Sequence, residues 1–374
     1  MRVQNNEERQ AEMKSETNAS PSRFLVINPG STSTKAAIYR GSSQWELEEE
    51  AQASLDHNGN ISSMEPIDQL EPRLQAVERF LEEHDSSGLR AVAGRGGLTR
   101  PLEAGSYGIN DGMIRDLSSA RYGNHASNLG ALMARRIAEQ RKIPSLIADP
   151  VGVDQFEPPA RYSGWPGLER KCQLHALNMR SVAREAARDM GGVMEDFNFI
   201  IAHLGGGISI GPMTGGRIID VNNAMDGGPF SPQRCGTLPL TGLIDICFSG
   251  EYRSAGELKK ALTRTGGLNA YLGTDDAREV IRRIKDGDEN AQSVYRAMAY
   301  QISKEIGAMA AVLKGRVDAI ILTGGLPRPP LSDWIAEHCS WIAGIRIYPG
   351  EMELLALARA AARHVFDGEV LLDY

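Results

Sequence analysis

Three consecutive glycines, Gly205, Gly206 and Gly207, lie between two short apolar runs, FIIA and ISI. Apolar runs of this length are typical of buried strands, so the glycines are expected in the turn of a hairpin. Because glycine has no Cβ atom, this turn can bring backbone N–H groups close to an anion and can adopt positive φ angles without strain. The pattern favours a phosphate-binding turn. The alternative is an ordinary hairpin turn, which is the commoner use of clustered glycines.

A second candidate hairpin precedes it in the chain. The apolar run 24–27 is followed by a polar segment and a second apolar run, 36–39. The polar segment offers amide, hydroxyl and ammonium groups, which suit a phosphate oxyanion or a hydrated Mg²⁺ ion; they belong to Asn28, Ser31, Ser33 and Lys35. Two such hairpins predict two related domains facing one cleft. A third apolar run, 319–322, leads into Gly324 and Gly325 and repeats the theme.

Single charged and imidazole residues complete the set of candidates. Arg95 is flanked by glycines, which leave its guanidinium room for a bidentate carboxylate or phosphate, although a surface turn is the commoner explanation. Asp149 follows the predicted strand 143–148 at the end where open α/β sheets bind ligands, or it is a turn aspartate before proline. His175 lies in the first turn of a predicted helix, where the helix dipole disfavours the imidazolium and favours a hydrogen-bond donor.

Composition limits the class of protein. A chain of 374 residues with 41% hydrophobic and 24% charged residues is typical of a globular protein of about two domains. The net charge of −7 argues against nucleic acid or an anionic membrane as partner. The four cysteines have no metal-ligand spacing, and the sequence contains neither a secretory signal nor a transmembrane run. A reduced, cytoplasmic protein is expected.

The elements that position these residues follow from periodicity and capping. Residues 1–23 are polar and aperiodic, and we predict a disordered extension. Besides the strands already named, the spacing of apolar residues predicts a strand at 91–93 and two helices that end near residues 140 and 190. It also predicts helices over 238–247, 255–263, 292–314 and 351–366. The spacing of glycines before Lys35 does not match a P-loop, which disfavours P-loop NTPases.

These motifs resemble the acetokinase family, and within it the butyrate kinases. The segments that carry the resemblance are VINPGSTSTK, RGGL, HASNLG, ADPVGVD, AHLGGGISI and LTGGL, and it extends from residue 24 to about residue 370. The resemblance implies an α/β fold with two ribonuclease H-like (actin-like ATPase) domains around a cleft. It further implies an acyl-substrate domain over 24–175, completed by 345–374, and a nucleotide-binding domain over 176–344.

The resemblance also implies roles for residues. Arg95 and Arg234 match the arginines that hold the carboxylate and the migrating phosphoryl group, and Asp149 matches an aspartate near the carboxylate. The first hairpin matches the phosphate and Mg²⁺ site, in which Asn28 and Glu353 support the metal. Three histidines match those around the phosphoryl group: His125, His175 and His203. The residues that match nucleotide contacts are Gly205, Gly206, Gly207, Asp276, Arg278, Gly324 and Gly325.

The implied reaction transfers the γ-phosphoryl group of ATP to a short-chain carboxylate and gives an acyl phosphate and ADP. A carboxylate is already ionised at neutral pH, so the reaction needs positioning and positive charge rather than a strong base. Direct in-line transfer is expected, and capture of the phosphoryl group by Asp149 or Glu353 is the alternative. Acetate kinases carry valines where this chain has Gly96 and Gly97, which predicts a larger acyl pocket and a four-carbon acid.

Several alternatives stay open. The chain is expected to act on butyrate, or else on isobutyrate or another branched acid, and to form a homodimer or larger assembly. The segment 226–229 is one residue shorter than in butyrate kinases, Gln233 replaces a glutamate and Met352 replaces an asparagine. These departures favour, as a rival, a relative that binds nucleotide without catalysis. An actin-like or chaperone-like ATPase would hydrolyse ATP and would not need the pair of arginines.

Overall fold

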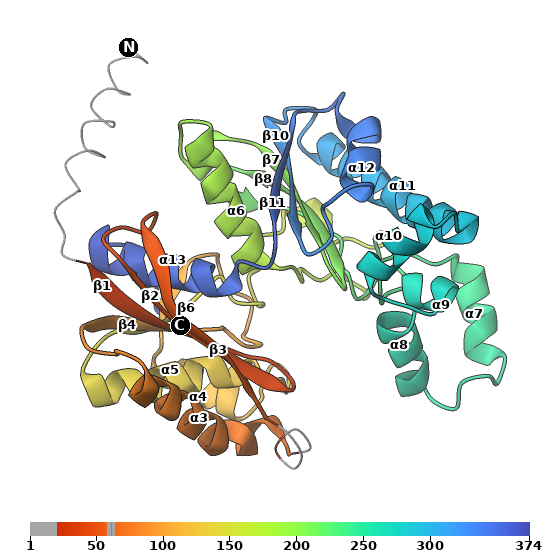
Figure 1. Ribbon diagram of the computed structural model, residues 1–374. Helices are drawn as coiled ribbons and strands as arrows, with labels where there is room; N and C mark the ends of the chain where they lie inside the picture. Colours follow the sequence, from red (N-terminus) through yellow and green to blue (C-terminus); the bar gives the residue numbers. More distant parts are fainter. Residues whose placement is uncertain (1–20, 58–60, 62–63) are drawn as a thin grey trace. The chain divides into compact units, whose positions relative to one another are not determined.

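A computed structural model describes residues 21–57, 61 and 64–374 (Figure 1). The chain divides into two compact units. Unit 1 comprises the chain up to Gly152 together with Met352–Tyr374, and unit 2 comprises Val153–Glu351. Each unit contains one mixed sheet with helices, as predicted, whereas the placement of the two units about a cleft stays a prediction.

The sheet of unit 1 has the strand order β3-β2-β1-β4-β6-β5. Strands β1, β2 and β3 are antiparallel neighbours, and β4 and β6 run parallel to β1. The short β5 closes the sheet antiparallel to β6. The bounds are β1 Ser22–Pro29, β2 Ser33–Gly41, β3 Leu47–Asp56, β4 Leu89–Gly94, β5 Ser106–Gly108 and β6 Ser145–Ala148.

Helices cover both faces of this sheet because β1 is apolar on both sides (Figure 1). Leu25 and Ile27 point to one face and join a core with residues of α3 and α5. Phe24 points to the other face, where its ring meets Phe366 of α13 edge-on at 5.7 Å. The helices are α3 Leu70–Glu83, α4 Asp111–Ser118, α5 Asn128–Arg141 and α13 Glu353–Phe366, with a short 3₁₀ helix, η1 Pro66–Gln69, before α3.

Unit 2 repeats this design with the strand order β11-β10-β7-β8-β9. Again the first hairpin, β7–β8, is antiparallel, and β10 and β11 run parallel to β7. This order, with its antiparallel hairpin edge, is the ribonuclease H-like arrangement predicted for both domains. The bounds are β7 Phe199–Leu204, β8 Ile208–Thr214, β9 Arg217–Ile218, β10 Ala319–Gly324 and β11 Ile345–Pro349.

The helices of unit 2 pack on its sheet in the same manner. Ile200, Ala202 and Leu204 of β7 share a core with α11 and α12, and α6 contacts β7 and β10. The bounds are α6 Ala176–Asp189, α7 Leu240–Phe248, α8 Ala255–Arg264, α9 Leu268–Leu272, α10 Ala277–Lys285, α11 Glu289–Val312 and α12 Leu331–Cys339. Short 3₁₀ helices lie at η2 Pro158–Arg161 and η3 Met194–Asp196.

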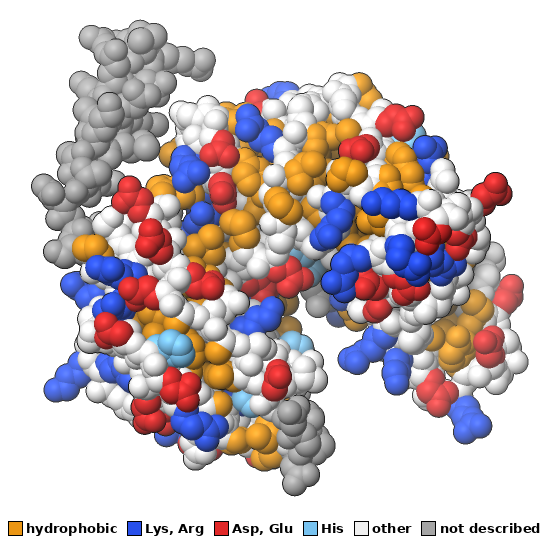
Figure 2. Space-filling view, in the orientation of Figure 1, with side chains coloured by type: hydrophobic (Ala, Val, Ile, Leu, Met, Phe, Trp, Pro, Cys, Tyr) orange, Lys and Arg blue, Asp and Glu red, His pale blue; other side chains and the backbone are white. Residues whose placement is uncertain are grey.

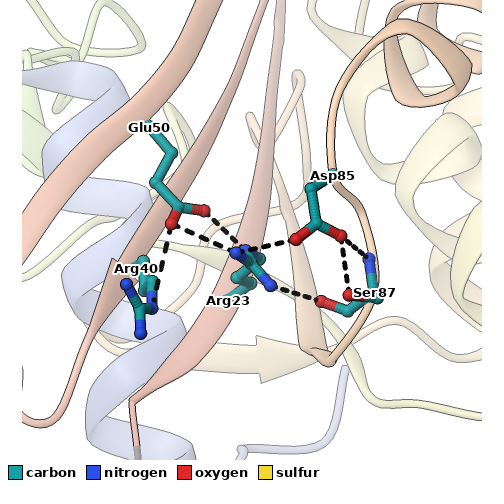
Figure 3. A network of polar contacts seen from close by, with 5 residues as sticks. All are labelled: Arg23, Arg40, Glu50, Asp85 and Ser87. Carbon is teal, nitrogen blue, oxygen red and sulfur yellow. Dashed lines mark hydrogen bonds and ion pairs between the residues drawn. The ribbon is translucent and has the colours of Figure 1, made fainter.

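The start of the first strand differs from the prediction. Residues 1–20 of the predicted disordered extension lie outside the described residues, but Ser22 and Arg23 belong to β1. Arg23 is held because its guanidinium contacts Glu50 at 2.5 Å, Asp85 at 2.9 Å and the carbonyl oxygen of Ser87 at 3.0 Å (Figure 3). The side chain therefore ties β1 to β3 and to the segment before β4.

The division between the units also differs from the predicted boundaries at residues 175 and 345. Residues 153–175 group with unit 2. Residues 345–349 form β11, which pairs with β10 from Ile320 to Gly324, so these residues belong to the second sheet. The return to unit 1 begins at Met352. No helix in the described part of the chain has the length and apolar character of a membrane span.

Candidate active site

The turn between β1 and β2 presents the polar residues predicted for a phosphate and metal site. The hairpin pairs Asn28 with Lys35, and the N–H group of Gly30 donates to the carbonyl oxygen of Ser33 at 2.7 Å. Ser31 and Lys35 are exposed, whereas Asn28 and Ser33 are half-buried. The four predicted residues therefore offer one ammonium, two hydroxyls and one amide from a single narrow hairpin, and the exposed Thr32 adds a third hydroxyl.

A buried arginine that is not among the residues predicted from sequence supports this turn from the inside. Arg73, from α3, is completely buried. Its guanidinium donates to the carbonyl oxygens of Ser31 and Ser33 at 3.2 and 3.1 Å, and to the hydroxyl oxygen of Thr34 at 2.9 Å. The only sequence signal is an arginine in the apolar stripe of a helix, which periodicity alone does not separate from a surface residue.

Arg95, Glu353 and Asn28 form one cluster in unit 1. Arg95 follows β4 and is 8% exposed, and its Nη2 atom lies 3.1 Å from a carboxylate oxygen of Glu353. The amide nitrogen of Asn28 donates to the other carboxylate oxygen of Glu353 at 2.7 Å. The second terminal nitrogen of Arg95 is buried without a hydrogen-bond partner among the described residues. This arrangement leaves one guanidinium nitrogen for an anionic ligand.

The same cluster fits the predicted Mg²⁺ ion. Magnesium in phosphoryl-transfer sites is held by one or two carboxylates together with waters and substrate phosphates, rather than by a full cage of protein ligands. Glu353 supplies the carboxylate and Asn28 an amide oxygen. The described residues contain no group of three His, Cys, Asp or Glu side chains that could hold a metal ion by themselves. The donor set therefore suits Mg²⁺ better than a transition metal.

Asp149 follows β6 in a strained backbone conformation. Its φ angle is 39°, which L-residues adopt rarely, and its side chain is 1% exposed. The carboxylate accepts a hydrogen bond from the N–H group of Gly105 at 2.8 Å, and the backbone of Asp149 donates to the carbonyl oxygen of Gly105 at 2.9 Å. The loop at 105 thus holds the aspartate at the strand end, where strain of this kind is frequent at functional sites.

Gly96 and Gly97 do not leave an open pocket, so the argument for a larger acyl site is wrong at these positions. A Cβ atom on Gly96 would lie 2.6 Å from Cβ of Pro150 and 3.1 Å from Cδ1 of Ile147. A Cβ atom on Gly97 would lie 2.5 Å from Cα of Asn128. Both glycines are needed because neighbouring segments already fill the volume that side chains would occupy.

His125 lies at the start of the segment that leads into α5. The N–H group of Ser127 donates to its Nδ1 atom at 3.1 Å, so Nδ1 is an acceptor and the proton of the neutral ring is on Nε2. Desolvation, together with the charge of Arg95, lowers the pKa of His125. The residue is therefore a neutral hydrogen-bond donor near Arg95 at physiological pH.

In unit 2, the three glycines form the turn between β7 and β8, as predicted. None of them has a positive φ angle, so the conformational part of the prediction is wrong. The reason for glycine is a close approach: a Cβ atom on Gly207 would lie 2.5 Å from Nη1 and 2.6 Å from Cζ of Arg234. The guanidinium of Arg234 therefore lies directly on the bare backbone of the turn.

Arg234 is a second partly unsatisfied arginine. Its Nε atom is buried without a hydrogen-bond partner among the described residues, and burial lowers the pKa of the guanidinium. The adjacent Gln233 donates from its amide nitrogen to Asp275 at 2.8 Å. A glutamate at position 233 would repel Asp275, which explains why glutamine accompanies aspartate here.

Two histidines stack beside the glycine turn. The rings of His175 and His203 lie 4.0 Å apart at an angle of 13°. His175 is the N-cap residue of α6, close to its predicted place, and its Nδ1 atom lies 3.0 Å from the hydroxyl of Ser209. His203 is buried, with its Nδ1 atom 2.8 Å from the amide oxygen of Asn178. The stacked geometry disfavours a state in which both rings are imidazolium ions, because two adjacent positive charges would repel each other.

The remaining predicted nucleotide contacts lie on two further segments of unit 2. Asp276 caps α10 by accepting from the N–H group of Arg278 at 2.9 Å, and hydrogen bonds from the Arg278 side chain lower the pKa of Asp276 to about 2. Gly324 has a φ angle of 93°, and a Cβ atom there would lie 2.3 Å from the carbonyl oxygen of Leu204. Gly325 has open space at its Cβ position. Gly324 therefore brings the end of β10 against the glycine turn.

The geometry groups the predicted residues by unit. In unit 1 it links Asn28, Arg95 and Glu353 directly, and in unit 2 it joins Arg234, His175 and His203 to the glycine turn. Asp276 and Arg278 pair with each other at 2.7 Å. Each group has the polar and cationic character that binds phosphate or carboxylate anions.

Comparisons with known proteins agree with these features. The sequence model of the Acetokinase family matches residues 165–329. Acetate kinase from Porphyromonas gingivalis is 18% identical with a TM-score of 0.73, over 91% of this chain and 98% of that one. A propionate kinase from Francisella tularensis subsp. tularensis is 18% identical with a TM-score of 0.69, over 91% of this chain and 98% of that one. Acetate kinase from Entamoeba histolytica is 16% identical with a TM-score of 0.69, over 90% of this chain and 98% of that one.

At these identities the solved structures show that the fold is shared along almost the whole chain. The family match covers a segment that lies entirely within unit 2 and includes the glycine turn and Arg234. The likeness to the Acetokinase family is therefore limited to residues 165–329, whereas the likeness of fold extends along almost the whole chain.

Proposed function

We propose that this protein is an ATP-dependent carboxylate kinase, which transfers the γ-phosphoryl group of ATP to a short-chain carboxylate. The observation that carries the proposal is the pair of incompletely satisfied arginines. Arg95 and Arg234 each keep one buried guanidinium nitrogen without a partner among the described residues. Unsatisfied buried donors of this kind are costly, so they are typical of sites where a ligand supplies the acceptor.

In the proposed reaction a carboxylate oxygen forms a bond to the γ-phosphorus as the bond from that phosphorus to the leaving ADP oxygen breaks. No proton needs to leave the nucleophile, because the carboxylate is ionised at neutral pH. Arg95 orients the carboxylate, and Asp149, held by Gly105, sets the position of the strand end beside it. Arg234, with His175 as a neutral donor, stabilises charge on the γ-phosphoryl oxygens.

The phosphates and the metal use the two hairpin turns and the segments beside them. Ser31, Ser33 and Lys35 bind phosphate oxygens, and Asn28 with Glu353 holds Mg²⁺. When bound, Mg²⁺ neutralises phosphate charge. The glycine turn, with His203 behind it, and the segments at Gly324 and Gly325 contact the nucleotide in unit 2, together with Asp276 and Arg278.

The finer proposal is that the preferred acceptor is butyrate, which gives butanoyl phosphate. Its support is the likeness of the sequence motifs to butyrate kinases, because the volume argument from Gly96 and Gly97 does not hold. Isobutyrate, acetate and propionate are the competing acceptors. The same residues would serve each of them, so the acid is decided by experiment.

The test is acyl-phosphate formation, trapped as the hydroxamate with hydroxylamine, using ATP, Mg²⁺ and acids from acetate to branched five-carbon acids. The proposal expects product that depends on the acid, with kcat/KM highest for butyrate. Arg234→Gln should lower kcat by about a hundredfold, as expected for loss of a charged transition-state contact. ATP binding without product from any acid would refute catalysis and favour a nucleotide-binding relative, whereas ATP hydrolysis independent of acid would indicate an ATPase.

The proposal includes a cytoplasmic homo-oligomer, a dimer or larger. Helix α7 exposes Leu240, Ile244 and Phe248 at 76, 55 and 86%, and hydrophobic side chains gather over this helix in Figure 2. Exposed apolar side chains on one helix are typical of surfaces that a second copy covers. Light scattering of the wild-type chain and of Phe248→Glu tests this part: a wild-type monomer would refute it.

A further inference from the structure

The guanidinium of Arg73 is a buried charge that forms no ion pair with a carboxylate of the described residues. Arginine has five N–H donors, and here all five are used. Besides Ser31, Ser33 and Thr34, the remaining acceptor is the amide oxygen of Gln69, at 3.0 Å from Nε and 2.7 Å from Nη2. Every one of these acceptors is neutral, and no ion pair of Arg73 exists within the part of the chain that the structure describes.

The residues around Arg73 do not supply a compensating charge either. The ring of His57 lies 2.9 Å from the hydroxyl of Thr34, on the side of Thr34 that Arg73 also contacts. Burial, and then the charge of Arg73, lower the pKa of His57, and the smaller opposing effect of Asp56, which pairs with Ser33 in the sheet, does not reverse this, so the ring is neutral at pH 7. Asp56 forms no ion pair with Arg73 among the described residues. The cluster of Arg73, Gln69, Thr34 and His57 therefore carries a net charge of about +1 inside unit 1.

An isolated buried charge is expensive for a protein. Burying a cation without an anion costs several kcal/mol even after relaxation, so such groups persist where they serve a ligand or a partner. A leucine or methionine at this position of α3 would pack with less cost. The position of the charge, behind the turn of the polar hairpin, indicates which ligand it serves.

The contacts also orient the turn. Because a trans peptide places its C=O and N–H groups in opposite directions, the carbonyl of Ser31 that faces Arg73 turns the N–H group of Thr32 away from it. The guanidinium thus draws carbonyl oxygens inward and leaves an amide directed outward, beside the exposed Ser31 and Lys35. Both effects make the outer side of the turn more favourable for an anion.

We propose that Arg73 is a positioning residue for the phosphate groups of the nucleotide, acting through the β1–β2 turn as a buried, uncompensated counter-charge. The inference rests on the proposed function in that the anion at this turn is taken to be a nucleotide phosphate. In this proposal Arg73, on α3, does not touch the ligand. It acts on the ligand only through the turn, which is a role that none of the predicted site residues has.

The decisive comparison changes the charge and keeps the arginine. Gln69→Glu places a carboxylate where the amide oxygen already accepts two bonds from Arg73, and so neutralises it. The amide nitrogen of Gln69 also donates to the carbonyl oxygen of Met64 at 2.7 Å, and both Gln69→Glu and Gln69→Leu remove this hydrogen bond. Gln69→Leu adds no charge, so it is the matched control for Gln69→Glu. A unit charge acting across about 10 Å at an effective dielectric constant of about 20 changes a binding constant by about tenfold.

The measurement is the Kd of MgATP and MgADP by titration calorimetry, with thermal unfolding of each variant. We expect Gln69→Glu to bind MgATP about tenfold more weakly than Gln69→Leu while its Tm is equal or higher. In turnover the loss should appear in KM for ATP, with KM for the carboxylate unchanged. Arg73→Met should weaken MgATP at least as much, and Arg79→Met, which removes an exposed arginine from the same helix, should not.

The outcomes separate this inference from the proposed function. Equal MgATP affinity of Gln69→Glu and Gln69→Leu, in an enzyme that makes acyl phosphate, would overturn the role of Arg73 and leave the function standing. Weaker binding by Gln69→Glu in a chain that makes no acyl phosphate would support Arg73 and refute the kinase. A wild-type chain that binds no nucleotide would overturn both.

Discussion

The contact between Gly207 and Arg234 allows a sharp test of the candidate active site. In Gly207→Ala the new methyl group would lie 2.5 Å from Nη1 of Arg234, whereas ordinary contacts begin at 3.4 Å. The guanidinium must therefore move by about 1 Å, and a displacement of this size at a catalytic group costs about a hundredfold in rate. The backbone at position 207 has no positive φ angle, so alanine brings no strain of its own.

Because the colliding group is the end of a flexible side chain, the fold should tolerate the substitution. We expect Tm to change little and kcat for acyl-phosphate formation to fall by about a hundredfold. The neighbouring glycines are matched controls. A Cβ atom on Gly205 would lie 3.5 Å from Nε2 of His203, and one on Gly206 would lie 3.2 Å from the amide oxygen of Gln233. Neither alanine displaces Arg234, so each should lower kcat much less than Gly207→Ala does, and any lost nucleotide contact should appear in KM for ATP.

Two results would refute this reasoning. If Gly207→Ala keeps the wild-type kcat, the position of the Arg234 guanidinium does not control the reaction. If all three alanine variants lose activity equally, then activity depends on the absence of side chains throughout the turn, rather than on the contact between Gly207 and Arg234. Measuring KM for ATP in the same series separates the two, because a lost backbone contact to phosphate should raise KM.

Three further predictions concern unit 1. Glu353→Gln removes the carboxylate that lies 3.1 Å from Arg95. This variant should have a kcat/KM lower by at least about tenfold and should need a higher Mg²⁺ concentration for half-maximal rate, and an unchanged Mg²⁺ dependence would contradict the proposed metal role of Glu353. Burial lowers the pKa of His57 below its unfolded value, so the unfolded state binds the proton more readily and the free energy of unfolding should fall as pH drops below about 6.5. Chemical denaturation at pH 7 and at pH 5 measures this loss of stability, which should be smaller in His57→Gln than in the wild type; an equal loss in both would contradict the assignment to His57. Gly97→Ala places a methyl group 2.5 Å from Cα of Asn128 and should lower the free energy of unfolding by about 1–3 kcal/mol, whereas a fully stable variant would show that this loop yields easily.

The strand and hairpin framework could be predicted because its signals are local. Runs such as 24–27 and 199–202 are continuously apolar, and the strands there are buried on both faces. The long helix predicted over 292–314 is α11, at Glu289–Val312, because its apolar positions recur at helical spacing. The strand β3 was not predicted, since Leu47–Asp56 is polar and largely exposed at a sheet edge.

The candidate site was predictable only in its residue types. Arg95, Glu353 and Asn28 were singled out from motifs, and the structure places them in contact with one another, whereas their roles stay predictions. The reason for glycine at 96, 97 and 207 was not predictable, because it depends on neighbours distant in sequence, such as Pro150, Asn128 and Arg234. Arg73 was missed because two of its five hydrogen bonds go to backbone carbonyl oxygens, which every residue has, and the others go to the uncharged side chains of Gln69 and Thr34.

The discontinuous composition of unit 1 has a consequence for how the protein is made. Asn28 and Glu353, which share a hydrogen bond, are separated by 325 positions in the chain. At ribosomal rates of about 5–20 residues per second, the carboxylate is synthesised about 16–65 s after its amide partner. Until then the sheet of unit 1 lacks α13, whose Phe366 covers Phe24, and Arg95 lacks its ion pair. A nascent chain, or one truncated before residue 353, therefore exposes an incomplete apolar face and lacks the Glu353 carboxylate of the proposed Mg²⁺ site. Unit 1 can be completed only after this C-terminal segment has been synthesised.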